Sequence, residues 1–136
     1  MGLTVDANVL FSALLKKGET RRIMFREEIT LFAPSFLKTE YDKYRNYLRK
    51  KFVGNDKEFN IIQDKLLSLI TFVGEANLKP YIPAAASLIK DENGWLYLAC
   101  ALKENTAIWS NDKEFKKQSR VEIKTTEELI KEFGGL

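Results

Sequence analysis

The chain has 136 residues, of which 45% are hydrophobic and 30% are charged, with three prolines and seven glycines. This composition is typical of a globular protein and excludes a disordered or fibrous chain. Two halves of about 70 residues would each be too small for a secure core, so we expect a single domain over residues 1–136. The net charge of +3 permits a polyanionic partner without establishing one.

Two absences narrow the chemistry further. The chain contains no histidine, which excludes imidazole general bases and histidine-containing zinc sites. Its one cysteine, Cys100, cannot form an internal disulfide and favours a reducing compartment. No apolar stretch approaches the roughly 20 residues of a membrane span, and the N-terminus lacks a signal-type apolar segment. We therefore expect a cytoplasmic protein without a membrane partner.

Hydrophobic periodicity predicts short strands that alternate with helices. In chain order, the predicted elements are a strand at 3–5, helices over 9–14 and 20–25, a strand at 29–33, helices over 35–52 and 57–73, an irregular connection over 74–83, helices over 84–89 and 95–103, strands at 107–110 and 121–124, and a helix over 126–133. The strands are too far apart for hairpins, so we expect parallel pairing through crossovers. The predicted fold class is α/β.

Two aspartates follow predicted strands. Asp6 comes directly after the first strand, and Asp112 follows the strand at 107–110. Because functional groups of parallel sheets gather at the carboxyl ends of the strands, both carboxylates are expected at the same edge. An aspartate at such a position taken alone is more often a turn former or a helix cap.

A third acid, Glu40, lies on one helix face with Phe36, Tyr44 and Leu48, at spacings of four residues. Burying its charge without a partner would be costly. It could pair with a lysine or arginine, remain exposed at the flank of the helix, or share a cation with the two aspartates. Oxygen ligands alone suit Mg²⁺ or Mn²⁺, and such a metal site supports phosphoryl chemistry without histidine.

Four segments resemble the ordered motifs of PIN domains. They are LTVDANVL at 3–10, APSFLKTE at 33–40, WLYLACAL at 95–102 and IWSNDKEF at 108–115. The resemblance spans most of the chain. It implies a three-layer α/β/α fold with a central parallel β-sheet and a ribonuclease activity that depends on Mg²⁺ or Mn²⁺. It also implies a possible role as a VapC-type toxin that an antitoxin protein holds inactive.

The same resemblance assigns roles to individual residues. Asp6, Glu40 and Asp112 match three acids of the family's metal site and are the expected catalytic and metal-binding residues. Ser110 matches a hydroxyl that often lies beside the last of these acids, and Asn8 matches a polar residue close to the first.

The chain departs from the family pattern at Gly94, where a further acid usually begins the helix that follows. Asp91 or Glu92 could supply a carboxylate from the preceding loop. Alternatively, the site is impaired, either naturally or by deliberate substitution. Because glycine at a helix start is readily replaced, the sequence predicts that Gly94→Asp leaves the fold unchanged.

Basic and apolar clusters suggest partners. Lys113, Lys116 and Lys117 follow Asp112 closely and are expected to contact an RNA backbone near the metal. The aromatic and basic residues of 44–51 could also bind RNA, but a solvated helix face is the simpler interpretation. An apolar stripe could bind an antitoxin helix or a second copy in a homodimer, although packing within the chain is the default; it comprises Leu66, Leu69, Ile70 and Val73.

These observations favour a metal-dependent endoribonuclease that cleaves single-stranded RNA, possibly as the toxin of a toxin–antitoxin pair. The first alternative is a PIN-like module with an impaired metal site that acts through RNA or protein binding without cleavage. The second is an unrelated α/β protein in which the three acids lie far apart.

Overall fold

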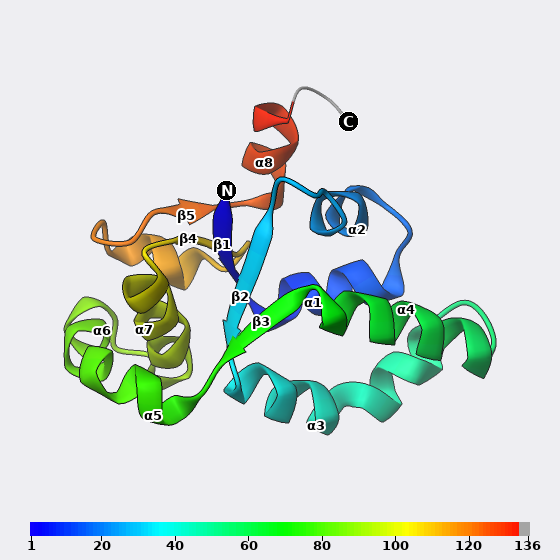
Figure 1. The fold of residues 1–136 in the computed structure, drawn as a ribbon, viewed down its shortest axis with the longest axis horizontal. Helices are drawn as coiled ribbons and strands as arrows, with labels where there is room; N and C mark the ends of the chain where they lie inside the picture. The colour runs from blue at the N-terminus through cyan, green and yellow to red at the C-terminus, as the bar shows by residue number, and fades with distance from the viewer. Residues whose placement is uncertain (134–136) are drawn as a thin grey trace.

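The structure is a computed structural model that describes residues 1–133, and its centre is a five-stranded parallel sheet (Figure 1). The strands are β1 (Gly2–Val5), β2 (Thr30–Pro34), β3 (Ile70–Val73), β4 (Ala107–Trp109) and β5 (Ile123–Lys124). Their spatial order is β3-β2-β1-β4-β5, and every neighbouring pair runs parallel. The predicted α/β class and parallel pairing are confirmed.

Helices cover both faces of the sheet (Figure 1). One layer contains α1 (Ala7–Leu15), α2 (Glu19–Met24), α3 (Phe36–Lys51), α4 (Asp56–Ser68) and α8 (Thr126–Glu132). The other contains α5 (Glu75–Leu78), α6 (Ile82–Leu88) and α7 (Trp95–Glu104), with α7 packed on β1, β2 and β4. Short 3₁₀ helices occur at η1 (Lys79–Tyr81), η2 (Glu92–Gly94) and η3 (Lys113–Lys117). The result is a three-layer α/β/α fold.

The helix predicted over 57–73 extends too far at its C-terminal end. The helix ends at Ser68, and Ile70–Val73 forms β3, which pairs with β2 at the edge of the sheet. β-branched and aromatic residues favour a strand there, but their apolar positions continue the helical spacing of α4 by chance. Most of the apolar stripe packs within the chain, because Leu66, Ile70 and Val73 are buried.

Other boundaries differ by local chemistry. Pro34 ends β2 instead of opening the next helix, and α3 begins at Phe36. Asn55 caps α4 in a capping box with Glu58, which places Asp56 at the first helical position. The connection predicted as irregular over 74–83 contains α5, η1 and the start of α6. The strand predicted from 121 begins only at Ile123.

The sheet ladder continues beyond two strand ends and fixes the residues that follow them. The Asp6 backbone N–H donates to the Trp109 carbonyl at 3.1 Å, and the Ser110 N–H donates to the Lys124 carbonyl at 3.1 Å. Further along, the Asn111 side chain donates to Thr126 Oγ1 at 3.1 Å and accepts from the Thr126 N–H at 2.9 Å. Hydrogen bonds at Ser110 and at Asn111 therefore fix the segment between β4 and Asp112.

Within residues 1–133, no helix combines the length and apolar character needed to cross a membrane.

Candidate functional site

A cavity of about 200 Å³ opens where β1 and β4 end. Its wall comes from segments far apart in the sequence and includes four of the acids considered above. The lining residues are Asp6, Asn8, Glu40, Ile89, Asp91, Asn93, Gly94, Tyr97, Asp112, Glu114 and Phe115. The structure thus brings Asp6, Glu40 and Asp112 to one place.

Asp6 is the most buried of these acids, with 8% of its surface exposed. It follows β1 directly and stands at the N-terminus of α1. The Ser110 hydroxyl donates to Asp6 Oδ2 at 2.7 Å, which holds the carboxylate in one orientation. Burial raises the pKa of Asp6, and the hydrogen bond from Ser110 only partly opposes that shift.

Asp112 lies three residues beyond the last residue of β4 and is exposed. Its backbone N–H donates to Ser110 Oγ at 3.0 Å, and its Oδ1 accepts from the Glu114 N–H at 2.9 Å, which caps η3. Ser110 therefore touches both aspartates: its hydroxyl donates to the side chain of Asp6 and accepts from the main chain of Asp112. The charge of Asp112 contributes to the raised pKa of Asp6.

Glu40 reaches the cavity from α3 and is half-buried. The core face of this helix runs through Leu37, Tyr41 and Leu48, whereas Tyr44 is 41% exposed, so Glu40 lies at the edge of the core face instead of in its middle. The reason is that a 16-residue helix packs along a slanted stripe and not along a strict four-residue row.

Tyr97 on α7 explains how Glu40 is held. The buried Tyr97 hydroxyl donates to Glu40 Oε1 at 2.5 Å. Burial and the hydrogen bond to Glu40 raise the pKa of Tyr97, so the phenol remains a neutral donor. Burial raises the pKa of Glu40, the charge of Asp6 adds to the shift, and the hydrogen bond from Tyr97 opposes it. Sequence reasoning missed Tyr97, because helical spacing marks it only as a core residue.

Asp91 and Glu92 are separated by the structure. Asp91 lines the cavity, whereas Glu92 is not among the lining residues. Asp91 Oδ1 accepts from the Asn93 N–H at 3.0 Å and caps η2, which fixes the side chain beside the start of α7. Of the two candidate replacements for the acid absent at position 94, Asp91 has the suitable position.

The space beside Gly94 is filled by apolar side chains. A Cβ atom at this position would lie 2.6 Å from Ile89 Cδ1 and 3.1 Å from Phe115 Cε1. Both neighbours are buried. Gly94→Asp therefore requires Ile89 to shift, so we expect the variant to keep the fold and to lose stability. The sequence could not show this crowding, because the side chains come from other segments.

Glu114 and Asn93 also line the cavity and were not predicted. Glu114 pairs with Lys117 at 2.8 Å within η3. The other predicted RNA contacts lie on the same short helix: Lys116 pairs with Glu128 at 3.1 Å, and Lys113 is exposed. The two ion pairs are exposed and individually weak, so both lysines can exchange their carboxylate partners for phosphate.

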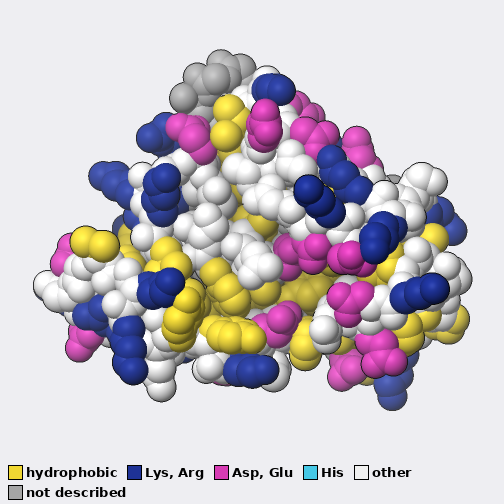
Figure 2. Space-filling model, turned by 180° about the vertical axis from the view of Figure 1, so that it is seen from behind, with side chains coloured by type: hydrophobic (Ala, Val, Ile, Leu, Met, Phe, Trp, Pro, Cys, Tyr) yellow, Lys and Arg dark blue, Asp and Glu magenta, His cyan; other side chains and the backbone are white. Residues whose placement is uncertain are grey.

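Neighbouring cations compensate the charges in the cavity only in part: the charge of Lys43 lowers the pKa of Glu40, but burial raises it by more. Among residues 1–133, none of Asp6, Glu40, Asp91 and Asp112 takes part in an ion pair. Figure 2 shows acidic side chains gathered around a hollow on one face, with lysine and arginine side chains nearby. Carboxylates that share a cavity repel one another, and a divalent cation would relieve this repulsion.

The donor set fits a hard divalent cation. All available donors are oxygens, which suits Mg²⁺ or Mn²⁺ and does not suit a thiolate or imidazole metal. In the described part of the chain, however, no three acidic or cysteine side chains are close enough to form a finished ligand cluster. The site therefore has the oxygen ligands of a metal centre, but these ligands are not gathered around one point.

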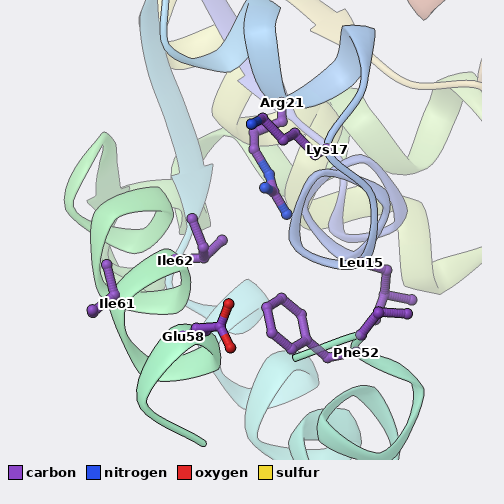
Figure 3. Close-up of a pocket in the computed structure, with 8 residues that line it drawn as sticks. Leu15, Lys17, Arg21, Phe52, Glu58, Ile61 and Ile62 are labelled. Atoms are coloured by element: carbon purple, nitrogen blue, oxygen red, sulfur yellow. The ribbon is translucent and has the colours of Figure 1, made fainter. Parts of the chain in front are cut away.

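A larger, mainly apolar hollow of about 460 Å³ lies between α1, α2 and α4 and shares no lining residue with the carboxylate cavity (Figure 3). Figure 3 shows the Arg21 side chain and the Phe52 ring pointing into it from opposite sides. Arg21 donates to the carbonyls of Ala13 and Leu14 at 2.8 and 2.9 Å, so its guanidinium closes the end of α1. Val53, at its rim, is 91% exposed, and Ile61 is 44% exposed. This hollow is called the helix groove below.

Comparisons with known proteins agree with this architecture. The sequence model of a family described as PIN domain matches residues 4–133. Comparison with curated proteins finds no significant match. Among solved structures, the chain is similar to one in the crystal structure of VapBC2 from Rickettsia felis bound to a DNA fragment from their promoter. The identity is 18%, the TM-score is 0.71, and the alignment covers 92% of this chain and 98% of that chain, so the likeness shows a common fold.

We expect Asp6→Asn to stabilise the metal-free protein near neutral pH. Burial raises the folded-state pKa of Asp6, so the unfolded chain ionises first and the folded state loses stability as the pH rises through the interval between the two pKa values. Asparagine carries no charge, so the variant avoids this loss of stability. Its side-chain oxygen can still accept the hydrogen bond from the Ser110 hydroxyl. The advantage should vanish well below about pH 4, where aspartate is protonated in both states.

Urea denaturation with chelator present, near neutral pH and well below about pH 4, measures the difference in stability between the parent and Asp6→Asn. The exposed Asp42 on α3 provides the control, because Asp42→Asn should change the stability little at either pH. An Asp6→Asn protein less stable than the parent at neutral pH would show that the charge of Asp6 is well compensated.

We expect Gly94→Asp to lower the free energy of unfolding by about 1–3 kcal/mol, because its Cβ overlaps Ile89 Cδ1. Ile89→Val removes that atom and alone should cost about 0.5–1.5 kcal/mol. The double variant should be more stable than the sum of the two single changes predicts, since the substitutions share one contact. Chemical denaturation of the four proteins measures the coupling, and simple additivity would refute the overlap.

Proposed function

Because this chain belongs to the PIN-domain family, whose members are generally nucleases, we propose that it is a metal-dependent endoribonuclease that cleaves single-stranded RNA. The observation that carries the proposal is the cavity lined by Asp6, Glu40, Asp91 and Asp112, with no cation paired to these carboxylates within residues 1–133. Carboxylates gathered in one cavity without paired cations suit the binding of a divalent cation.

Under this proposal Asp6, Asp112 and Glu40 hold Mg²⁺ or Mn²⁺, and Asp91 contributes the carboxylate that position 94 lacks. The bound cation supplies neutralisation of phosphate charge and a water of lowered pKa. Because the described acids form no finished cluster, binding requires some of these side chains to approach one another. The exposed Asp91 and Asp112 can make that adjustment if they give up their helix-capping hydrogen bonds to Asn93 and Glu114. Asp6 is held by burial and by Ser110.

The surrounding residues orient the acids. Ser110 holds the Asp6 carboxylate and the Asp112 main chain at once. Tyr97 uses its only donor on Glu40 Oε1, which leaves the second carboxylate oxygen without that bond. Asn8 adds a polar group at the start of α1. Lys113, Lys116 and Lys117 would contact the RNA backbone beside the cavity, and Asp112 caps the η3 helix that carries them.

A second candidate function is RNA or protein binding without cleavage. Two observations favour it: the place of the missing acid is filled by Ile89 and Phe115, and the described acids form no finished metal cluster. The two candidates differ in one measurable property, which is metal-dependent hydrolysis.

We also propose that the protein is the toxin of a toxin–antitoxin pair in the cytoplasm. The similar fold in a VapBC2 complex supports this role. The helix groove would accept the antitoxin, because exposed Val53 and Ile61 lie there beside Lys17, so the partner segment should be apolar with an acidic flank. A homodimer remains a further proposal, to be decided by the mass of the protein in solution.

We expect the parent to cleave single-stranded RNA with Mg²⁺ or Mn²⁺ and to lose this activity in chelator. Asp6→Asn should lower the rate by at least about 100-fold, and Asp91→Asn by about 10–100-fold, because each removes a charged metal ligand. Glu92→Gln is the matched control for Asp91→Asn, since its carboxylate does not line the cavity and the rate should stay within about twofold. Cleavage of a labelled RNA provides the rates.

Metal binding is measured separately by thermal unfolding. Millimolar Mg²⁺ or Mn²⁺ should raise the Tm of the parent and not that of Asp6→Asn, because the ion binds only the folded site. A Tm shift without cleavage would favour the binding module. The absence of both a Tm shift and RNA cleavage would refute the metal site.

The toxin proposal predicts that induced expression slows the growth of a bacterial host. Asp6→Asn should restore growth at equal protein level, because the fold persists while the metal site is weakened. Colony counts after induction, with protein amounts checked by immunoblot, measure the effect. Equal growth inhibition by both proteins would assign the harm to expression alone.

A further inference from the structure

Next to the carboxylate cavity lies a second hollow of about 440 Å³. We propose that this hollow, called the lysine groove, binds the nucleotide adjoining the cleaved phosphate, with Lys90 and Lys117 contacting the RNA backbone. The proposal rests on the proposed function, because it takes the carboxylate cavity as the place of the reacting phosphate. It extends that function by naming a substrate-binding surface on the far side of Ile89.

The groove and the cavity are neighbours that share part of their walls. Ile89 and Glu114 line both of them. On one wall, the chain passes from Lys90 in the groove to Asp91 in the cavity within one residue. On the other wall, η3 contributes Glu114 to both hollows and Lys117 to the groove. A strand that leaves the cavity between these walls therefore enters the groove directly.

The volumes of the two hollows indicate which part of the RNA each one can hold. The cavity of about 200 Å³ has room for a phosphate and its metal-bound surroundings but is below the usual volume of a pocket for a larger organic ligand. The groove of about 440 Å³ lies within that range. The base and sugar attached to the reacting phosphate must lie outside the small cavity, and the groove is the space that adjoins it.

The charges of the groove suit a phosphate backbone, unlike those of the acidic cavity. Lys90 is exposed and forms no ion pair with any other described residue. Lys117 pairs with Glu114 at 2.8 Å, but the side chains are 66% and 47% exposed. Exposed pairs of this kind are weak, so Lys117 can turn to a phosphate at little cost.

The remaining lining favours contact without base reading. Ala86, Leu88 and Ile89 are aliphatic, so they pack against a base without forming hydrogen bonds to its edge. The Ser87 hydroxyl, which also lines the groove, already donates to the Ala84 carbonyl at 2.6 Å. The Trp95 indole N–H donates to the Ile89 carbonyl at 2.9 Å, which fixes this wall to the start of α7. The groove should therefore bind single-stranded RNA with little sequence preference at this nucleotide.

Fluorescence anisotropy with a labelled single-stranded RNA tests the proposal. The measurement is made in chelator on the Asp6→Asn background, so that the RNA stays intact. Lys90→Ala and Lys117→Ala should each raise the Kd about 5–10-fold near 50 mM salt. The double variant should reduce the slope of log Kobs against log salt by about 1.4, since each phosphate contact of a single strand contributes about 0.7.

Lys65→Ala is the matched control, because it removes the same charge from an exposed position on α4, outside both hollows. If the groove variants bind as Lys65→Ala does while the parent cleaves RNA, the groove is refuted and the proposed function stands. A parent that neither binds nor cleaves RNA refutes both. Circular dichroism of each variant confirms that a change in Kd does not come from unfolding.

Discussion

The candidate site depends on the parallel pairing of β1 with β4. This pairing places Val5 opposite Trp109, so the residues that follow, Asp6 and Ser110, leave the sheet side by side. The hydrogen bond from the Ser110 hydroxyl to Asp6 Oδ2 at 2.7 Å is possible only in that register. A slip of one residue would turn each side chain to the opposite face and separate the two groups.

Holding several carboxylates in one cavity is costly for the folded state. Burial raises the pKa values of Asp6 and Glu40, and the acids add to each other's shifts. Neutral donors, Ser110 and Tyr97, fix the two carboxylates without cancelling their charge. An arrangement that keeps the charges and omits the cations is what a binding site for a divalent ion requires.

The sequence alone determined the fold class and predicted three of the acids that line the candidate site. The separation of the strands allows only crossover connections, which predicts parallel pairing, and parallel strands collect the residues at their carboxyl ends. Asp6 and Asp112 could therefore be assigned to one edge of the sheet before any coordinates, and the motif around Glu40 added the third acid. These inferences succeed because they rest on local pattern and on the direction of the chain.

Only the tertiary structure decided which groups share the space around those acids. The apolar spacing of residues 70–73 suits a helix as well as a strand. These residues form a strand because they pair with β2. Tyr97 was recognisable as a partner of Glu40 only once α7 and α3 were placed together. Likewise, Ile89 and Phe115 close the space at Gly94, and Asp91 instead of Glu92 faces the cavity. Each of these contacts joins residues from separate elements, and the energy of packing between elements has no signal in the local sequence.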